Sequence, residues 1–528
     1  MNTSEFLMIA GAIVPDRPAI IFDGQTTTFE GLAERVNRLA NGLSEMGVGP
    51  GDRVATMQVN TNQCIEAYFA AAQLDAIYVP INFRAKTDEL AQMLKIAQPT
   101  CLLLGERYLS LVPESSQSAV SIVLLDGEAT GSHRSYDALL SESSPDQMHF
   151  PEAGDEDTTV IMFTAGTTGV PKGVMLTHDS FSSYLLATVE PADPEIEESN
   201  LITVPFYHIA GLQAALAAVY GGRTLVVMRQ FEPGEWLRLA QEKQVNRAML
   251  VPTMLKHLME HPDFSEHDLS SLSVITYGAA PMPLEVIREA IARFPGARFI
   301  NAFGQTETAS TITMLPPDDH VLDGSPEEIE TKLKRLTSIG KPLDDVEVRI
   351  VDEGGKTVAV GETGEIVARG SRMMAGYWHE ESATRDAMRD GWIYTGDLGY
   401  QDADGYIFLS GRAKDFIKRG GEMVSPEEVE MVLRSHPEVD DAAVIGVPDV
   451  EWGEEVRAVV VGRSGEVTEK QIIEFCKEKL AGFKRPRSVV FVGELPRNVM
   501  GKVLKRDLRE EYSYRWKTRT KIKERSEN

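Results

Sequence analysis

The segment Thr159-Val-Ile-Met-Phe163, followed by Thr164-Ala-Gly-Thr-Thr-Gly-Val-Pro-Lys-Gly-Val174, is the most informative part of the sequence. The first five residues form a short apolar run, which is typical of a buried strand. Glycines and threonines follow, so a loop is expected at the exposed end of that strand. Glycine lets backbone N–H groups approach an anion, and Lys172 adds a positive charge. This composition predicts a phosphate-binding loop, with an ordinary surface loop as the alternative. It is not a Walker loop, because the spacing GxxxxGK[ST] is absent.

Around this loop, apolar runs of strand length alternate with amphipathic helical patterns. We expect strands at residues 201–204, 224–228, 248–251, 274–277 and 298–300, and helices at 233–243 and 284–294. Such alternation favours an α/β fold with layers of largely parallel sheet. From about residue 340 the pattern changes to close-set strands with glycine turns, at 346–351, 364–368 and 406–409. That part favours a small antiparallel or barrel-like unit.

The pattern restarts after Gly411-Arg-Ala-Lys-Asp415. Helices are expected at 426–435 and 469–480, and strands at 442–446, 456–461 and 489–492. These elements form a small α+β unit of about the minimum size for an independent domain. The sequence therefore predicts a large N-terminal domain over residues 1–411 and a small C-terminal domain over 417–528.

The composition is that of an ordinary globular protein. The chain has 528 residues and a mass of 58.2 kDa, with 42% apolar and 25% charged residues, and this length favours more than one domain. A net charge of −27 argues against nucleic acid or an anionic membrane as a partner. The three cysteines form no CxxC pair, so neither a disulfide framework nor a zinc site is expected. No signal peptide and no integral membrane segment is predicted, which favours the cytoplasm.

The loop at 164–174 resembles the phosphate-binding signature [ST]SGTTGxPKG of the adenylate-forming superfamily. That superfamily includes acyl-CoA synthetases, firefly luciferase and the adenylation domains of peptide synthetases. Further motifs occur in the family's order, so the resemblance covers roughly residues 25 to 508. It implies that ATP phosphates bind at Thr164, Gly166, Thr167, Thr168, Gly169 and Lys172. Ala165 departs from the signature by removing one hydroxyl group.

Three more motifs resemble the family's nucleotide site. Each also has a plainer interpretation, namely a tight turn at 277–281, a solvated charge at Glu307 and a turn-stabilising aspartate at Asp397. The resemblance implies that Phe303 stacks on adenine, that Thr306 contacts the α-phosphate and that Glu307 holds Mg²⁺. It implies that Asp397 and Arg412 contact the ribose. The remaining residues assigned to the nucleotide are Gly278, Ala279, Ala280, Pro281, Ala302 and Gly304.

Other motifs resemble the family's substrate and catalytic segments. The segment 204–211 resembles the border of the acyl channel, which implies that Tyr207, His208 and Gly211, together with Ala280, line the pocket. His208 is expected to line or gate it and not to act as a base. The loop 496–503 resembles the catalytic-lysine loop, which assigns Lys502. The resemblance also makes residues 412–416 a hinge at Lys414, and it implies that Lys418, Gly420 and Gly421 face CoA. Met423 departs from the polar residue often present there.

The resemblance implies an acid–thiol ligase that uses ATP, Mg²⁺ and CoA, in the acyl-CoA synthetase branch. The acid is expected to be fatty or otherwise apolar, because small and uncharged residues occur in the two segments near the expected pocket, namely Ala210, Gly211, Gly278, Ala279 and Ala280. Alternatives are an amino-acid or aryl-acid adenylating enzyme with another acceptor, a luciferase-like oxygenase, or a nucleotide-binding homologue without catalysis. The segment 204–211 has no acidic residue to pair with an α-amino group, which disfavours the amino-acid alternative. A homodimer stays open.

Overall fold

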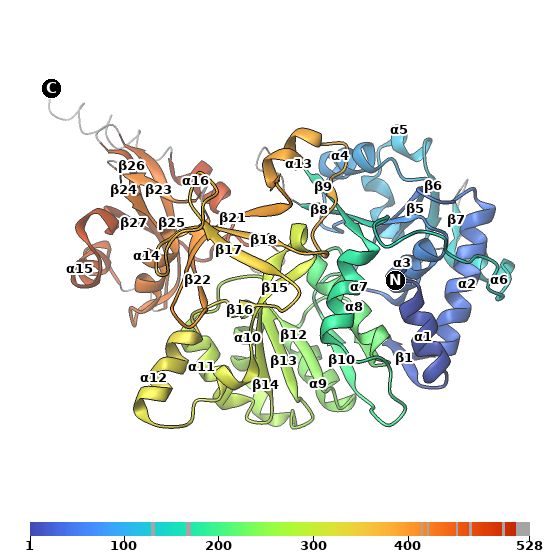
Figure 1. Ribbon diagram of the computed structural model, residues 1–528, viewed down its shortest axis with the longest axis horizontal. Helices are drawn as coiled ribbons and strands as arrows, with labels where there is room; N and C mark the ends of the chain where they lie inside the picture. The colour runs from blue at the N-terminus through green and yellow to red at the C-terminus, as the bar shows by residue number, and fades with distance from the viewer. Residues whose placement is uncertain are drawn as a thin grey trace.

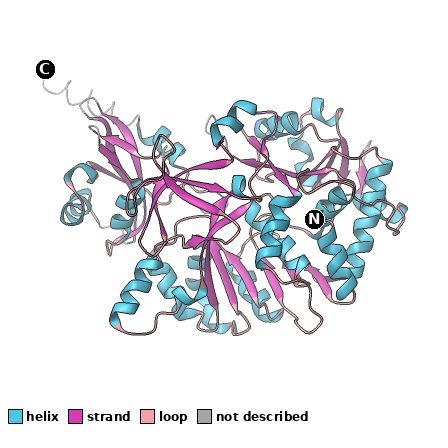
Figure 2. Ribbon diagram, viewed as in Figure 1, coloured by secondary structure: helices cyan, strands magenta, loops and turns pink. Residues whose placement is uncertain are grey.

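The computed structural model describes residues 1–127, 133–164, 170–412, 415–419, 422–449, 452–463, 467–498 and 502–513. Two layered α/β sheets and a smaller antiparallel sheet make up the larger part of the molecule. A small α+β domain lies at the left end in the view of Figure 1. Figure 2 shows helices packed around the sheets. The mixed α/β architecture predicted from the sequence is confirmed.

The first sheet carries the predicted phosphate loop. It has eight strands in the order β19-β9-β8-β4-β3-β5-β6-β7. The strands are β3 (Arg53–Met57), β4 (Ile77–Pro80), β5 (Cys101–Leu104), β6 (Ser121–Leu124), β7 (Arg134–Ser135), β8 (Thr158–Thr164), β9 (Lys172–Thr177) and β19 (Gly376–Tyr377). The pairs from β8 through β7 are parallel, whereas β9 is antiparallel to both β8 and β19. The antiparallel pair β8–β9 therefore brings the two ends of the loop together.

The second sheet has nine strands in the order β16-β15-β14-β13-β12-β10-β11-β1-β2. They are β1 (Pro18–Phe22), β2 (Gln25–Thr28), β10 (Ser199–Ile202), β11 (Thr224–Val227), β12 (Arg247–Leu250), β13 (Val274–Gly278), β14 (Arg298–Gln305), β15 (Ser310–Leu315) and β16 (Lys341–Pro342). Strands β1 and β10 to β14 pair in parallel, as predicted. Strand β14 continues five residues past the predicted run because β15 pairs with it in antiparallel fashion.

Helices cover these two sheets (Figure 1). The helices are α1 (Glu5–Ile13), α2 (Phe29–Glu45), α3 (Asn62–Gln73), α4 (Thr87–Ala97), α5 (Glu114–Gln117), α6 (Tyr136–Glu142), α7 (His178–Thr188), α8 (Ile209–Tyr220), α9 (Pro233–Glu242), α10 (Pro252–Met259), α11 (Leu284–Arg293), α12 (Pro326–Arg335) and α13 (Glu381–Ala387). Short 3₁₀ turns are η1 (Glu106–Leu111), η2 (Pro262–Glu266), η3 (Thr306–Thr308) and η4 (Pro317–His320). The predicted helices at 233–243 and 284–294 correspond to α9 and α11. Within the described residues, no helix combines the length and apolarity that crossing a membrane requires.

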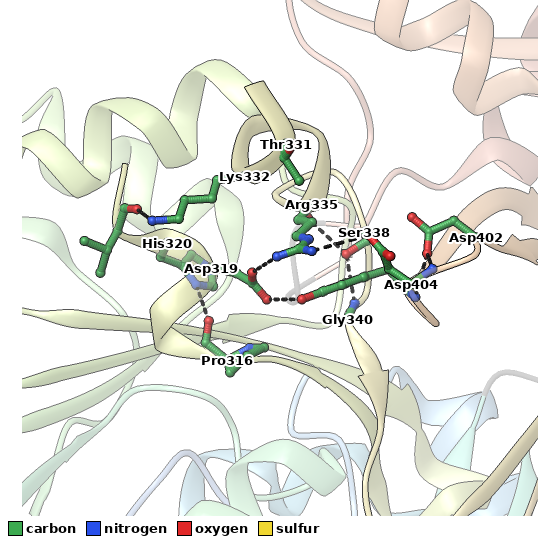
Figure 3. Close-up of polar contacts among 12 residues, drawn as sticks. Pro316, Asp319, His320, Thr331, Lys332, Arg335, Ser338, Gly340, Asp402 and Asp404 are labelled. Atoms are coloured by element: carbon green, nitrogen blue, oxygen red, sulfur yellow. Dashed lines mark hydrogen bonds and ion pairs between the residues drawn. The ribbon is translucent and has the colours of Figure 1, made fainter. Parts of the chain in front are cut away.

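A five-stranded antiparallel sheet follows. Its strands are β17 (Glu347–Val351), β18 (Gly364–Arg369), β20 (Met388–Arg389), β21 (Trp392–Gln401) and β22 (Ile407–Arg412). Every pairing in it is antiparallel, so the antiparallel form of the predicted unit is the one found. A polar network ties this sheet to η4 and α12. Asp319 accepts hydrogen bonds from Arg335 at 3.0 Å and from the Tyr406 hydroxyl at 2.7 Å (Figure 3).

The C-terminal domain contains a mixed sheet with three helices. It comprises β23 (Ile417–Arg419), β24 (Glu422–Val424), β25 (Val439–Asp449), β26 (Gly453–Gly462) and β27 (Ser488–Phe491), with α14 (Pro426–Arg434), α15 (Glu469–Lys479), α16 (Lys505–Ser513) and the 3₁₀ turn η5 (Gly482–Lys484). Among the described residues, each buried apolar cluster draws on residues up to 409 or from 417 onward, never on both. The domain bounds 1–411 and 417–528 stay a prediction.

Candidate active site

Thr164 and Lys172 stand opposite each other at the base of the predicted phosphate loop. They are register partners in the antiparallel pair of β8 and β9, and both are half-buried. The residues between them that the sequence assigned to phosphate, Gly166, Thr167, Thr168 and Gly169, lie outside the described residues. The pairing of β8 and β9 therefore holds the two ends of the loop next to each other, and Lys172 is the first residue after the loop.

A tyrosine that the sequence analysis did not single out connects Lys172 to Glu307. The Lys172 ammonium lies 4.9 Å from the centre of the Tyr377 ring, which is cation–π distance. The Tyr377 hydroxyl donates to Glu307 Oε1 at 2.9 Å. Burial, and then the negative charge of Glu307, raises the pKa of Tyr377 above its usual range, so the phenol stays protonated and donates. The available sequence signal was the aromatic pair Tyr377-Trp378, which lies between the second and third strands of the predicted antiparallel unit.

Glu307 is positioned by the chain reversal between β14 and β15. It lies in η3, where its carbonyl accepts from Met374 N–H at 3.0 Å. Gly304 is required for this reversal, since a Cβ there would lie 1.4 Å from the Ser310 carbonyl oxygen. Glu307 and its neighbour Thr306 are half-buried. The motif around Glu307 is thus held by backbone packing that only glycine permits.

The residues around Glu307 fit a magnesium ion that is held largely by other ligands. No cluster of three or more histidine, cysteine, aspartate or glutamate residues that could hold a metal occurs among the described residues. A lone carboxylate matches Mg²⁺, which binds through one or two carboxylates while phosphate oxygens and water complete its octahedron. Tyr377 donates to only one carboxylate oxygen of Glu307, Oε1.

Asp397 and Arg412, both assigned to the ribose, form an ion pair with each other. They are register partners in β21 and β22, and Arg412 Nε lies 2.8 Å from Asp397 Oδ1. The Asp397 side chain is 9% exposed, whereas that of Arg412 is 31% exposed. Gln305 Nε2 donates to the Thr395 carbonyl at 3.5 Å, which ties the glutamate motif to β21. The structure thus brings the predicted metal and ribose residues together.

The segment assigned to adenine lies at the ends of β13 and β14. Gly278 and Ala302 are register partners there. A Cβ on Gly278 would lie 2.1 Å from the Ala302 carbonyl oxygen, so close strand packing excludes any side chain. Ala279 follows with a left-handed φ of 65°, Ala280 is half-buried and Pro281 is exposed. Phe303 is half-buried and packs against two apolar clusters, which leaves part of its ring accessible.

The predicted acyl segment contains buried polar atoms without partners. Among the described contacts, Tyr207 Oη and His208 Nε2 are buried and have no hydrogen-bond partner. Their rings lie 4.4 Å apart, and the Tyr207 ring meets Phe83 edge-on at 5.5 Å. Burial lowers the pKa of His208 to about 4, so its imidazole is neutral near pH 7. This agrees with a lining residue and gives no reason to assign a base.

Gly211 is a packing glycine in α8. A Cβ at this position would lie 2.4 Å from the Pro205 carbonyl oxygen and 2.7 Å from that of Val204. Backbone atoms cannot move aside as a flexible side chain can. Only glycine therefore fits at position 211 in the first turn of α8. Its predicted place in the acyl pocket stays a prediction.

Lys502 belongs to the C-terminal domain and is exposed. Its N–H donates to Asn498 Oδ1, and its carbonyl accepts from Asn498 N–H, both at 2.9 Å. In Figure 1 this domain lies at the left end of the molecule, whereas β8 and β9 lie near its upper middle. In that view the C-terminal domain therefore lies apart from the two strands that flank the predicted phosphate loop. Lys418 is exposed on β23, and the assigned Lys414, Gly420 and Gly421 lie outside the described residues, as does the side chain of Met423.

The antiparallel strands that flank the predicted phosphate loop, the glutamate after β14 and the carboxylate on β21 are arranged as expected for a nucleotide-dependent ligase of the adenylate-forming class. The sequence profile described as AMP-binding enzyme matches residues 10–378, and that of the AMP-binding enzyme C-terminal domain matches residues 428–502. The chain belongs to the AMP-binding enzyme family, and its assignment to the acyl-CoA synthetase branch is confirmed.

Relatives match over nearly the whole chain. A feruloyl-CoA synthase of Amycolatopsis is 34% identical over 500 residues, which cover 94% of this chain and 96% of that protein. The fatty acid–[acyl-carrier-protein] ligase ScoC of Streptomyces coeruleorubidus is 33% identical over 504 residues, 94% of each chain. The crystal structure of ATP-bound MatB from Rhodopseudomonas palustris superposes with a TM-score of 0.86 at 30% identity, covering 97% of this chain and 99% of that one.

Proposed function

We propose that this protein joins a fatty or other apolar carboxylic acid to CoA in two steps. In the first, a carboxylate oxygen attacks the α-phosphorus of ATP, the bond to the β-phosphate oxygen breaks, and acyl-AMP and pyrophosphate form. In the second, the CoA thiol attacks the acyl carbon, the bond to AMP breaks, and the thiol proton is released. The convergence of Lys172, Tyr377 and Glu307 is the observation that supports this best.

The first step is an electrostatic task for the protein. Charge builds up on the transferring phosphoryl oxygens, so cations placed in advance lower the barrier. We assign Lys172 and the loop that starts at Thr164 to the phosphates, and Lys502 to the attacking carboxylate and the α-phosphate. Asp397 accepts from the ribose hydroxyls beside Arg412, and Phe303 lies against adenine.

Mg²⁺ is proposed to bind Glu307 together with phosphate oxygens. Bound there, it would neutralise charge on the triphosphate and help pyrophosphate to leave. Tyr377 keeps the carboxylate oriented by donating to one of its oxygens, which leaves the other for the ion.

The second step is proposed to need a rotation of the C-terminal domain about Lys414. In the described arrangement this domain lies apart from β8 and β9 (Figure 1). Lys502 must approach the phosphates for the first step and leave for the second. Lys418, Gly420 and Gly421 would then face CoA.

The proposal also specifies the class of carboxylic acid and the thiol that accepts the acyl group. Buried apolar and aromatic side chains around Tyr207 favour an apolar acyl or aryl group. Feruloyl-CoA synthase and a fatty acid–carrier-protein ligase are both relatives, so an aryl acid and a carrier-protein acceptor are the alternatives to test first.

One experiment separates these alternatives. Pyrophosphate release is measured with short, medium, long and aromatic acids, and product is measured with CoA and with a phosphopantetheinylated carrier protein in parallel. We expect release that depends on an apolar acid, and a thioester with CoA. Pyrophosphate release without thioester on CoA would contradict the CoA assignment. No release with any acid would favour a nucleotide-binding homologue without catalysis.

A further inference from the structure

A lysine close behind Lys502 is held between two glutamates of α14. Lys505 Nζ lies 2.8 Å from Glu430 Oε1 and 3.3 Å from Glu427 Oε1. The side chains of Lys505 and Glu430 are 13% and 7% exposed, so this cluster is largely shielded from water. We call these three residues the Lys505 clamp.

One end of the clamp continues directly into the catalytic-lysine loop. Arg497 and Val503 form an antiparallel bridge, and Leu504 N–H donates to the Pro496 carbonyl at 2.8 Å. The backbone and Asn498 hold Lys502 at the tip, as described above. Only two residues separate Lys502 from Lys505, so the clamp restrains the base of this closed loop on one side.

Glu427 of the clamp lies against the chain next to the ion pair of Asp397 and Arg412. Gly411 has a left-handed φ of 123°, and a Cβ there would lie 2.1 Å from Glu427 Oε2. Ser425 Oγ donates to the Ser410 carbonyl at 2.5 Å. Gly411 precedes Arg412, which pairs with Asp397. Glu427 therefore lies against the chain that leads from the nucleotide site into the C-terminal domain.

The positive charge of Lys505 stabilises the two neighbouring carboxylates of the clamp. Burial raises the pKa of Glu427, an effect that Lys505 opposes and Glu430 reinforces. Burial alone would lower the pKa of Lys505, but Glu430 and Glu427 raise it overall. Without the ammonium, the neighbouring carboxylates would repel each other, although Arg434 still lies 3.6 Å from Glu430. Removing one partner of a buried pair costs more than the pair contributes.

We propose that Lys505 is a positioning residue for the adenylation step, which fixes the loop that carries Lys502 on helix α14 of the C-terminal domain. The inference rests on the proposed function, because it takes Lys502 as the cation of the first step. A loop fixed at its base presents its tip lysine in one place, and misplacement of a catalytic group by about 1 Å lowers the rate roughly 100-fold. All three clamp residues belong to the C-terminal domain and move with it. Acyl transfer to CoA is proposed to need no cation at Lys502, so that step should not depend on the clamp.

The test compares Lys505→Gln, Lys505→Arg and Arg506→Gln. Arg506 is the matched control, because it is the adjacent cation and its side chain is 68% exposed. For Lys505→Gln we expect the kcat of acid-dependent pyrophosphate exchange to fall about 10- to 100-fold, with KM values changed less than about 3-fold. Conversion of supplied acyl-AMP to acyl-CoA should stay within about 3-fold. Lys505→Arg should restore most of the exchange rate, and Arg506→Gln should resemble the wild type.

A second readout needs no substrate. Backbone amide hydrogen exchange at Lys502 and Leu504 should become at least about 10-fold faster in Lys505→Gln and stay unchanged in Arg506→Gln. Unchanged exchange at these amides, or equal loss in both half-reactions, would overturn the positioning role. If Lys505→Gln fails to fold, Glu427→Gln tests the clamp from the Gly411 side and must show the same selective loss. A wild-type protein that forms no acyl-AMP would refute the proposed function, while amide exchange would still decide the clamp.

Discussion

The Tyr377 hydroxyl donates to Glu307 Oε1 at 2.9 Å, and the same aromatic ring lies under the Lys172 ammonium. These residues come from β19, η3 and β9, which lie far apart in the sequence. Tyr377 is placed by its pairing with Val174 on β9, two residues after Lys172. One phenol thus connects the proposed phosphate and metal groups, orienting the carboxylate with its hydroxyl and holding the cation with its face.

Tyr377→Phe removes the hydroxyl and keeps the ring. We expect the Mg²⁺ concentration for half-maximal adenylation to rise about 10- to 100-fold, because a hydrogen bond to a charged group contributes about 1.5–3 kcal/mol. The control is Tyr400→Phe, whose ring stacks on Phe408 outside the site. An unchanged Mg²⁺ dependence in Tyr377→Phe would show that the hydroxyl does not orient the metal ligand.

Glu307→Gln keeps an oxygen that accepts from Tyr377 but removes the negative charge. Adenylation should fall about 10- to 100-fold at limiting Mg²⁺ and recover in part at high Mg²⁺, because a neutral amide is a weaker ligand for a hard cation. Pyrophosphate release over a magnesium series measures this. The exposed Glu380→Gln is the control, and wild-type kinetics in Glu307→Gln would remove the metal assignment.

Lys502→Ala should separate the two half-reactions. Acyl-AMP formation should fall at least about 100-fold, whereas supplied acyl-AMP should still be converted to acyl-CoA, because a cation at the α-phosphate acts only in the first step. The two reactions are assayed separately, with the exposed Lys477→Ala as the control. Loss of the second reaction to the same degree would indicate a different role for Lys502.

Ala280→Trp should change the preference among acids. Ala280 is half-buried beside the strand ends, so an added ring fills space that the acyl group is proposed to use. Activity with the bulkiest acids should fall first, since packed interiors reorganise little. A uniform loss with every acid would place Ala280 outside the acyl site. Gly211→Trp is not equivalent, because even a Cβ meets the Pro205 carbonyl at 2.4 Å, and it should be read as a folding defect.

Three histidines, of which His178 and His320 are buried and His208 is half-buried, should make stability fall on acidification. Burial lowers the pKa of His178, His208 and His320 to about 4, against about 6.5 in an unfolded chain. The unfolded state therefore takes up protons first. Stability is complete above about pH 6.5 and is lost as pH falls toward 4, with each histidine accounting for on the order of 2 kcal/mol at pH 5.

Denaturant unfolding at pH 7.5 and pH 5 checks this with His320→Gln. His320 Nδ1 lies 2.9 Å from the Pro316 carbonyl (Figure 3), and its Nε2 lies 2.9 Å from the Tyr277 hydroxyl. The first contact requires Nδ1–H, so the neutral ring accepts from tyrosine. The variant should lose less free energy of unfolding than the wild type between the two pH values. The exposed His257→Gln should keep the wild-type dependence, and an equal loss in all three proteins would contradict the assignment to His320.

Local patterns were sufficient for the type and order of most elements. Apolar runs and helical periodicity located β8, β10 to β13, α9, α11 and α14 within a few residues, because period and composition follow directly from which face is buried. The motif that ends in Glu307 and the pair Asp397 and Arg412 were likewise found in sequence. In both cases glycines stand within a few residues of the side chains that carry the chemistry, namely Gly304, Gly396 and Gly411. A glycine in such a motif is visible in a short stretch of sequence.

Only the tertiary structure decided which distant residues meet. Tyr377 lies 70 positions beyond Glu307, its acceptor, and Lys505 lies 78 beyond Glu427, so no short window of sequence contains either pair. A side chain at Gly211 would meet the backbone carbonyls of Val204 and Pro205. That contact depends on the path of the chain before α8, which the sequence does not show. The sequence by itself determined the family, the order of elements and the residue types available for chemistry. Strand pairing and helix packing determined the contacts, because these bring together groups whose separation along the chain carries no periodic signal.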